Sequence, residues 1–400
     1  MSAPASIVAP ARRLEFGNGS LRVEALPGAG RPLRVFLCSH DGYGLGHLRR
    51  NTLIAAALRA AHPSLQATLI TGVVTDPGWS DARGVDVLRM PPVLKDSMGI
   101  YRGQGMDATE ALSVRERLFR SAVATGKPDL ILVDRHPYGT GGELRRGLEI
   151  AAAQGAVLVL GLRDVLDEPG VVRSELTGRG WDGVPDLFDE VLVYGSPSFV
   201  DHEREYGLPL RPRYTGWVTG SAPPARRTPR TLAVTAGGGG DGADVVDLAV
   251  GLVRRRPGWS AVVAAGPYAD AWVPLPDDVA ARVRVASDVR GCAGLFASAE
   301  AVVQMAGYNS TFEALRASSR PILAPRRRPR REQAIRAWRL ASWGLADVID
   351  AGASVDEVDW LLDQPRMVTQ QAVRQAGITF DGAARTADVI GALAEARRAA

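Results

Sequence analysis

Two segments of this chain begin with the same three-part pattern, in which a short apolar strand is followed by a glycine-rich turn and a helix. The first has its strand at 34–39 and its helix from about His47; the second has its strand at 231–236 and its helix at 243–254. Further apolar strands and amphipathic helices alternate after each start. Because this alternation is typical of parallel sheets covered by helices on both faces, we expect two α/β domains.

A proline-rich segment separates the two patterns. TGSAPPARRTPR at 219–230 contains three prolines and no apolar periodicity, which indicates a linker. The extension before the first strand has no apolar run behind Arg12 and Arg13, so we expect a loosely docked segment and not a signal peptide. The expected parts are an extension over 1–33, a Rossmann-like domain over 34–218, the linker over 219–230, a second Rossmann-like domain over 231–385 and a C-terminal helix over 386–400.

Composition excludes several classes of protein. Hydrophobic residues make up 46% of the 400 residues and charged residues 23%, which fits a globular protein and not a disordered or fibrous one. The longest apolar runs, such as 156–162, are far shorter than the roughly 20 residues of a membrane span. Cys38 and Cys292 lie far apart and favour a reducing compartment, so we expect a cytoplasmic protein. A formal charge of +4 is too small to indicate a nucleic-acid partner.

The first glycine-rich loop, SHDGYGLGHLRR at 39–50, differs from a dinucleotide-binding loop. Its glycines alternate instead of following G-x-G-x-x-G, and no strand-end acidic residue follows at the usual distance of about 20 residues. His47 stands where the loop enters the helix, next to His40 and Asp41 in the same motif. Carboxyl ends of strands line the ligand crevice of open α/β sheets, which makes these residues catalytic candidates, although His47 is equally explained by capping or packing. The loop glycines are Gly42, Gly44 and Gly46.

The second glycine-rich loop contains five glycines in the six positions 237–242. Glycine loses more backbone entropy on folding than any other residue, so a plain turn is a poor explanation for such a run. A closely approaching ligand is a better one, because the backbone N–H groups of a glycine loop and the following helix N-terminus favour a phosphate. We favour a cradle for a diphosphate over a flexible turn.

A third motif, AGYNSTFE at 306–313, opens a helix after an apolar strand. Ser310 and Glu313 have the S-x-x-E spacing of a capping box, which needs no ligand. The same segment also has donors for a ligand at a helix N-terminus, and a carboxylate one turn further in can accept from two ribose hydroxyls. The residues alone leave both interpretations open. The candidate donors are Gly307, Asn309, Ser310 and Thr311.

The fourth motif is a basic run, RRRPRREQAIRA at 326–337. A solvated loop is the usual explanation, and the alternatives are neutralisation of phosphates or contact with an anionic membrane surface. Glu332 and Gln333 at the expected helix start offer a carboxylate and an amide that suit sugar hydroxyls, or else favour the helix dipole.

Together these motifs resemble those of GT-B glycosyltransferases. The segment 307–313 resembles the G-W-N-S-T-x-E core of their sugar-nucleotide box, and EQAIRA at 332–337 resembles its D-Q-x-x-N-A end. The glycine loops resemble those of the family-28-like N-acetylglucosaminyltransferases that form lipid II. SHDGYGLGHLRRN, GLRDVLDEP and RYTGWV resemble bacterial predicted glycosyltransferases. Three positions depart from the box: Met305, Tyr308 and Arg336 stand where histidine, tryptophan and asparagine are usual.

The resemblance implies two Rossmann-like domains that face each other across a cleft, an acceptor domain at 34–218 and a nucleotide-sugar domain at 231–385. It implies an inverting, metal-independent transferase that moves a sugar from a nucleoside diphosphate sugar, most simply a UDP sugar, to an acceptor hydroxyl. No cofactor is implied, and the basic run leaves peripheral membrane contact open. The alternatives are a nucleotide-sugar 2-epimerase of the same fold and an inactive regulator that binds a nucleotide sugar.

The resemblance also implies roles for individual residues. Glu313 binds the ribose, and Glu332 and Gln333 bind the sugar. The diphosphate lies near Gly238, Gly239, Gly240, Ser310 and Thr311. An acceptor hydroxyl is a weak nucleophile near neutral pH, so a base must take its proton. His47 is the first choice for this base, and its rivals at expected strand ends are His40, Asp41, Asp134, His136 and Asp164.

Overall fold

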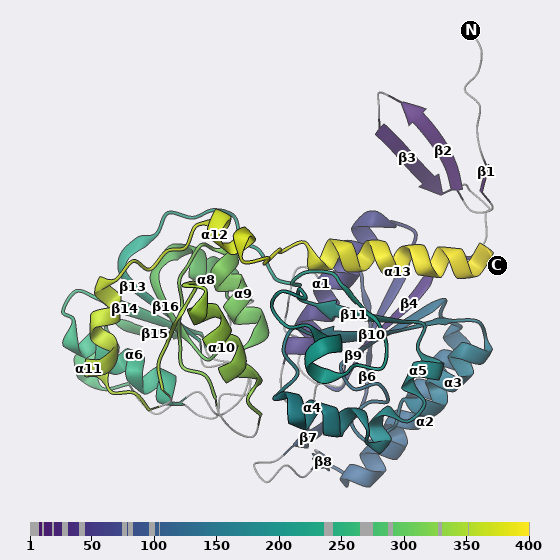
Figure 1. Ribbon diagram of the computed structural model, residues 1–400, viewed down its shortest axis with the longest axis horizontal. Coiled ribbons are helices and arrows are strands. Elements are labelled where there is room, and N and C mark those ends of the chain that lie inside the picture. Colours follow the sequence, from purple (N-terminus) through teal and green to yellow (C-terminus); the bar gives the residue numbers. More distant parts are fainter. Residues whose placement is uncertain are drawn as a thin grey trace.

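The chain folds into two α/β domains that lie side by side, as expected (Figure 1). The computed structural model describes residues 8–9, 12–17, 20–25, 31–39, 45–73, 78, 83–95, 101–103, 105–235, 243–264, 275–286, 291–326, 330–350 and 352–399. In these parts of the chain, no helix combines the length and the apolar character needed to cross a membrane.

The first domain is built on a seven-stranded parallel sheet in the order β12-β11-β10-β9-β4-β5-β6. Its central strands are nearly continuous apolar runs because helices cover both faces, and β9 is buried at every position. The strands are β4 (Arg34–Ser39), β5 (Gln66–Thr71), β6 (Asp86–Arg89), β9 (Leu130–Asp134), β10 (Val157–Arg163), β11 (Glu190–Tyr194) and β12 (Pro212–Tyr214).

Five α-helices and several short elements complete this domain. The side chain of Asp107 caps α2 by accepting from the backbone N–H groups of Thr109 and Glu110. The helices are α1 (Gly46–Ala61), α2 (Ala108–Gly126), α3 (Arg145–Ala153), α4 (Pro169–Leu176) and α5 (Val184–Leu187). The short elements are the antiparallel pair β7 (Val93–Lys95) and β8 (Tyr101–Gly103), a 3₁₀ turn at Arg179–Trp181 and a π-helical turn at His202–Tyr206.

The second domain has a six-stranded parallel sheet in the order β15-β14-β13-β16-β17-β18. Its strands are β13 (Thr228–Thr235), β14 (Ser260–Ala264), β15 (Val283–Ala286), β16 (Ala299–Gln304), β17 (Ile322–Leu323) and β18 (Asp347–Val348). Its helical elements are α6 (Ala243–Arg255), α7 (Asp277–Ala280), α8 (Ala293–Ser298), α9 (Tyr308–Arg316), α10 (Glu332–Ser342), α11 (Val355–Asp359), a 3₁₀ turn (Trp360–Asp363) and α12 (Gln370–Gln375).

The C-terminal helix α13 (Gly382–Ala399) returns to the first domain and lies along it (Figure 1). Two ion pairs hold its end, from Arg397 to Asp189 at 2.6 Å and from Arg398 to Asp129 at 3.0 Å. The helix starts four residues before the expected 386. Likewise β13 starts at Thr228, within the segment expected to be the linker.

The segment expected as a loose extension contains strands. Residues 8–25 include an antiparallel sheet of β1 (Val8–Ala9), β2 (Arg12–Gly17) and β3 (Ser20–Ala25), in which Arg12 pairs with Ala25 and Gly17 with Ser20. Figure 1 shows this sheet apart from both domains, beyond the end of α13.

A buried ion pair joins the two domains. Arg336 on α10 donates from Nε and Nη2 to the two carboxylate oxygens of Asp164, which follows β10, at 2.9 and 2.7 Å. Both side chains are at most 1% exposed. Asp164 also accepts from the indole N–H of Trp217 at 3.3 Å and from the backbone N–H of Val165 at 2.7 Å. The relative position of the domains therefore depends on a fully hydrogen-bonded buried carboxylate.

Removal of one partner from this ion pair should destabilise the protein strongly. We expect Arg336→Met to lower the free energy of unfolding by about 3–5 kcal/mol, because Asp164 then stays buried without its cation. Asp164→Leu combined with Arg336→Met should recover much of this loss, since no uncompensated charge remains. Chemical denaturation of the wild type, Arg336→Met, Asp164→Leu and the double variant measures both effects. Arg254→Met, which breaks the exposed pair with Asp278, is the control and should have little effect. A double variant as unstable as the sum of the two single variants would contradict this account.

Candidate active site

The strand orders place the predicted loops at the reversal point of each sheet. In the first domain the chain places β5 and β6 on one side of β4 and then β9 to β12 on the other; in the second, β14 and β15 lie on one side of β13 and β16 to β18 on the other. Ligands of open parallel sheets bind outside the carboxyl ends of the strands at such points. The loops after β4, β9, β13 and β16 therefore define the candidate site. Several predicted residues of these loops lie outside the described residues: His40, Asp41, Gly42, Gly44, Gly238, Gly239 and Gly240.

A histidine and an aspartate meet at the reversal point of the first sheet. Asp134 is the last residue of β9 and its side chain is fully buried, while His47 is the second residue of α1 and 13% exposed. His47 Nδ1 lies 2.9 Å from Asp134 Oδ1. We assign the proton to Nδ1, because a carboxylate only accepts, and this leaves Nε2 as the ring atom able to take a proton. A Cβ atom at Gly46, the residue before His47, would lie 3.8 Å from the side-chain nitrogen of Asn309.

Arg50 fixes the aspartate in place. Its Nε and Nη2 donate to the two carboxylate oxygens of Asp134 at 2.8 and 2.9 Å, and its guanidinium lies over the rings of Tyr194 and Tyr308 at 5.2 and 4.9 Å. Nη2 also lies 2.8 Å from His47 Nδ1. Two N–H donors cannot bond to each other, so both groups use Asp134 as their acceptor. This bidentate pair holds the carboxylate in one orientation toward the histidine.

The rival bases are placed differently. Asp164 is occupied by Arg336, Trp217 and its own chain, so this placement argues against a role as base and for a role between the domains. His136 lies two residues beyond Asp134 and is half-buried. Asp134 itself is best placed as the partner of His47, a pairing that sequence reasoning missed although it named both residues.

The motif at 306–313 forms the start of α9 without the expected capping box. The helix begins at Tyr308 with Gly307 as its N-cap, and the structure gives this cap no side-chain hydrogen bond. Ser310 therefore lies inside the helix, where its hydroxyl donates to the carbonyl of Gly307 at 3.4 Å. The capping-box alternative is wrong. Thr311, also in the first turn, is buried, and its hydroxyl has no hydrogen-bond partner among the described residues.

Two side chains of this motif cross to the first domain. The amide of Asn309 donates to the carbonyl of Gly46 at 3.1 Å, directly before His47. The hydroxyl of Tyr308 donates to the carbonyl of Tyr194 at 3.1 Å and accepts from the backbone N–H of Val218 at 3.0 Å. Tryptophan has no hydroxyl that could make these contacts, so they explain why a tyrosine stands at position 308.

Glu313 lies one turn further along α9 and is 4% exposed. Its carboxylate accepts from the backbone N–H groups of Cys292, at 3.3 Å, and Gly220. Burial raises the pKa of Glu313, and Arg49 of α1 opposes this rise together with the two backbone hydrogen bonds. The carboxylate thus faces the linker and α1, between the two domains.

Glu332 and Gln333 open α10, and both side chains have contacts within the chain. Gln333 Oε1 accepts from the backbone N–H of Arg326 at 3.0 Å. Glu332 is 3% exposed and lies 3.7 Å from Arg163 and 3.4 Å from Arg326. Burial alone would raise the pKa of Glu332, but the surrounding arginines outweigh it and lower the pKa to about 2. Its Oε2 has no hydrogen-bond partner within the described part of the chain.

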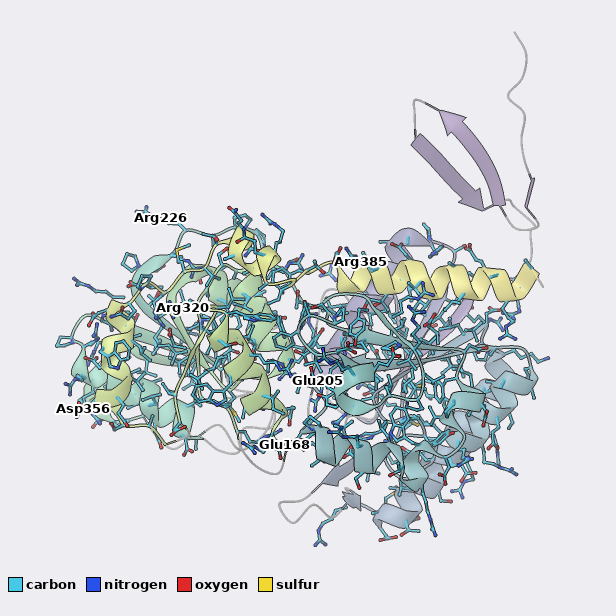
Figure 2. The ribbon with its side chains drawn as sticks, in the orientation of Figure 1. Glu168, Glu205, Arg226, Arg320, Asp356 and Arg385 are labelled. Carbon is cyan, nitrogen blue, oxygen red and sulfur yellow. The ribbon has the colours of Figure 1, made fainter. Side chains whose placement is uncertain are left out.

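The basic run at 326–337 lies at the domain boundary, where its described arginines pair with carboxylates, although Arg331 stays 56% exposed. Arg330 pairs with Glu175 at 2.7 Å and Arg331 with Glu168 at 2.6 Å, both acidic residues of the first domain. Further along α10, Arg339 pairs with Glu205 at 2.6 Å. Figure 2 shows Glu168 and Glu205 on the side of the first domain that faces the second.

Comparison with known proteins supports the fold assignment. No protein-family model matches the chain, and no curated protein sequence matches it. Solved structures do match over most of the chain. MurG of Acinetobacter baumannii has a TM-score of 0.58 and 14% identity over 90% of this chain and 100% of its own. The kitacinnamycin glycotransferase has a TM-score of 0.63 and 17% identity over 91% and 100%. SnogD of Streptomyces nogalater, a glycosyltransferase, has 0.55 and 19% over 92% and 98%.

These similarities show that the chain has the GT-B fold, with two Rossmann-like domains, as the sequence predicted.

Because the neighbouring arginines lower the pKa of Glu332, the effect of its substitution on the free energy of unfolding should depend on pH. A carboxyl group with a depressed pKa stabilises the folded state above its ordinary pKa and loses this effect as the pH falls toward the depressed value. We expect Glu332→Gln to lower the free energy of unfolding by about 3 kcal/mol at pH 7 and by roughly 2 kcal/mol at pH 3.5. Urea unfolding at both pH values measures this difference. Glu116→Gln on α2 is the exposed control, and a Glu332 effect that does not depend on pH would contradict the prediction.

Proposed function

We propose that this protein is an inverting glycosyltransferase that moves a sugar from a nucleoside diphosphate sugar to an acceptor hydroxyl. One observation supports this most: in a GT-B fold, the His47–Asp134 pair stands at the reversal point of the first sheet, and Asn309 of the second domain contacts the residue before His47. The proposed base and the proposed donor motif thus come from opposite domains and lie in contact.

His47 acts as the general base. Its Nε2 takes the proton of the acceptor hydroxyl while the hydroxyl oxygen attacks the anomeric carbon and the bond to the diphosphate breaks. Asp134 orients the ring through Nδ1 and stabilises the imidazolium, and Arg50 keeps Asp134 in position. A single displacement inverts the anomeric centre.

The second domain holds the donor. The N-terminus of α9, with the hydroxyl of Thr311 in its first turn, offers hydrogen-bond donors to the diphosphate as its charge increases. Glu313 binds the ribose. Because N–H and hydroxyl groups can carry the charge of the leaving group, we propose that no divalent cation is required. We propose a UDP sugar as the donor on the resemblance of the motif at 306–313 to the sugar-nucleotide box.

Replacement of His47 tests the base. We expect His47→Ala to lower turnover by roughly 10²–10⁴-fold, the usual contribution of a positioned base, with a much smaller effect on donor affinity. The measurement is release of nucleoside diphosphate at saturating donor, together with donor titration by calorimetry. His62→Ala is a matched control, because His62 caps the other end of α1 and is also 13% exposed. If His47→Ala keeps more than about a tenth of the wild-type turnover, His47 is not the base.

Replacement of Glu313 tests the ribose contact. If its carboxylate accepts from ribose hydroxyls, Glu313→Gln should weaken UDP binding by on the order of 1–3 kcal/mol. If Glu313 only fastens the backbone of Cys292 and Gly220, the melting temperature falls and UDP affinity stays the same. Titration of UDP into both proteins separates the two results. Glu205→Gln, which removes another carboxylate between the domains, controls for a general effect on their contact.

A further inference from the structure

Arg135 directly follows Asp134, so it is one residue from the carboxylate that orients His47. Its side chain is buried, with 8% of the residue exposed. Among the residues that the structure describes, the guanidinium has no hydrogen-bond or ion-pair partner, whereas the backbone N–H donates to the carbonyl of Gly161 at 3.0 Å. The residue also has a φ of 80°, which is unfavourable for a side chain of this size.

Both features cost stability. A positive φ at a residue other than glycine adds strain of on the order of 1–3 kcal/mol, and burial of the side chain disfavours the charged form of the guanidinium. Burial and the neighbouring cations Arg163 and Arg330 lower the pKa of Arg135 to about 9, while the carboxylates of Glu175 and Glu332 act in the opposite direction, so the group is still charged at neutral pH. Such features cluster at binding and catalytic sites, where an incoming group supplies the missing partner.

Glu175 and Glu332 attract Arg135 electrostatically, but within the described part of the chain neither forms a hydrogen bond or an ion pair with it. Arg330 is already paired with Asp167 at 3.4 Å and Glu175 at 2.7 Å. Glu332 lies 3.7 Å from Arg163. Arg163 is the last residue of β10, and Arg135 directly follows β9, the strand that pairs with β10. Arg163 still has a buried Nε without a hydrogen-bond partner in the described part of the chain.

We propose that Arg135 and Arg163 bind a carboxylate or phosphate group of the acceptor, close to the hydroxyl that is glycosylated. This inference rests on the proposed glycosyl transfer. Both arginines belong to the acceptor domain, at the carboxyl ends of adjacent strands, and Arg135 adjoins the residue that holds the base. Guanidinium groups bind carboxylates and phosphates through paired N–H donors, so two neighbouring arginines select an anionic acceptor over a neutral one.

A purely structural role makes the opposite stability prediction. If Arg135 held the fold together, its loss would lower the melting temperature. If the guanidinium of Arg135 instead serves to bind an anion, Arg135→Asn should raise the melting temperature. Asparagine tolerates a positive φ, and the substitution removes a charge that burial disfavours. Arg163→Gln supplies a second variant at a residue with ordinary backbone geometry. Arg146→Asn removes a charge from an exposed position on α3 and is the control.

Phenyl phosphate is a suitable probe, with benzyl alcohol as its neutral counterpart, and both are titrated by ligand-observed NMR in the presence of saturating UDP. The nucleotide occupies the donor phosphate site, so the probe reports on the acceptor side. We expect the wild type to bind phenyl phosphate more tightly than benzyl alcohol, and Arg135→Asn and Arg163→Gln to weaken phenyl phosphate binding at least about tenfold. Arg146→Asn should leave it unchanged.

Three results would overturn the inference. Equal affinity of the wild type for the two probes excludes an anion subsite, and unchanged phenyl phosphate affinity in both variants excludes these arginines. A tenfold loss by Arg135→Asn in affinity for UDP-glucuronate, without a matching loss for UDP-glucose, assigns the arginines to the donor sugar instead. Failure of the proposed function is distinguishable, because the wild type would then neither transfer nor release the sugar of a UDP sugar, whatever its affinity for the two probes.

Discussion

The ion pair between Asp164 and Arg336 is the interaction on which the site depends. It is buried, carries a bidentate hydrogen bond, and joins α10 of the second domain to the end of β10 in the first. Tyr308 lies between this arginine and Arg50, with its ring 5.9 and 4.9 Å from the two guanidinium groups. Because Arg50 also holds Asp134, the contact between the domains and the orientation of His47 belong to one connected cluster. A shift of one domain therefore disturbs the base as well.

Arginine has different roles in different parts of this cluster. Arg336 and Arg50 are balanced by buried aspartates and fix geometry, while Arg330 and Arg331 pair with acidic residues across the domain boundary. Arg135 is the exception, since it lies beside the proposed base with no ion-paired or hydrogen-bonded carboxylate among the residues that the structure describes. The paired charges fix the contact between the domains, whereas a guanidinium without an ion-pair partner is suited to bind a substrate. The described arginines of the basic run thus pair with acidic residues of the same chain.

The sequence predicts the fold well because its signals are local. Apolar strands, glycine turns and the proline-rich segment each depend on neighbouring residues, and the strand order then places the loop before His47 and the motif at 306–313 at the reversal points. The site is harder to predict because its contacts span long separations. His47 and Asp134 are 87 positions apart, and Asp164 and Arg336 are 172 apart. Tyr308 and Arg336 are departures from the glycosyltransferase box in the sequence. Their partners in the first domain explain them only once the structure is known.

The most direct test of the account is the anomeric configuration of the sugar that the protein releases from a UDP sugar when water replaces the acceptor. Proton NMR, recorded before mutarotation and with excess chelator present, distinguishes the two anomers of the first-formed product. A direct displacement assisted by His47 predicts that an α-linked donor gives the β-anomer and that the chelator does not stop the reaction. An α-anomer formed first, an epimerised UDP sugar in place of a released sugar, or loss of all activity in the chelator that added metal restores would contradict it.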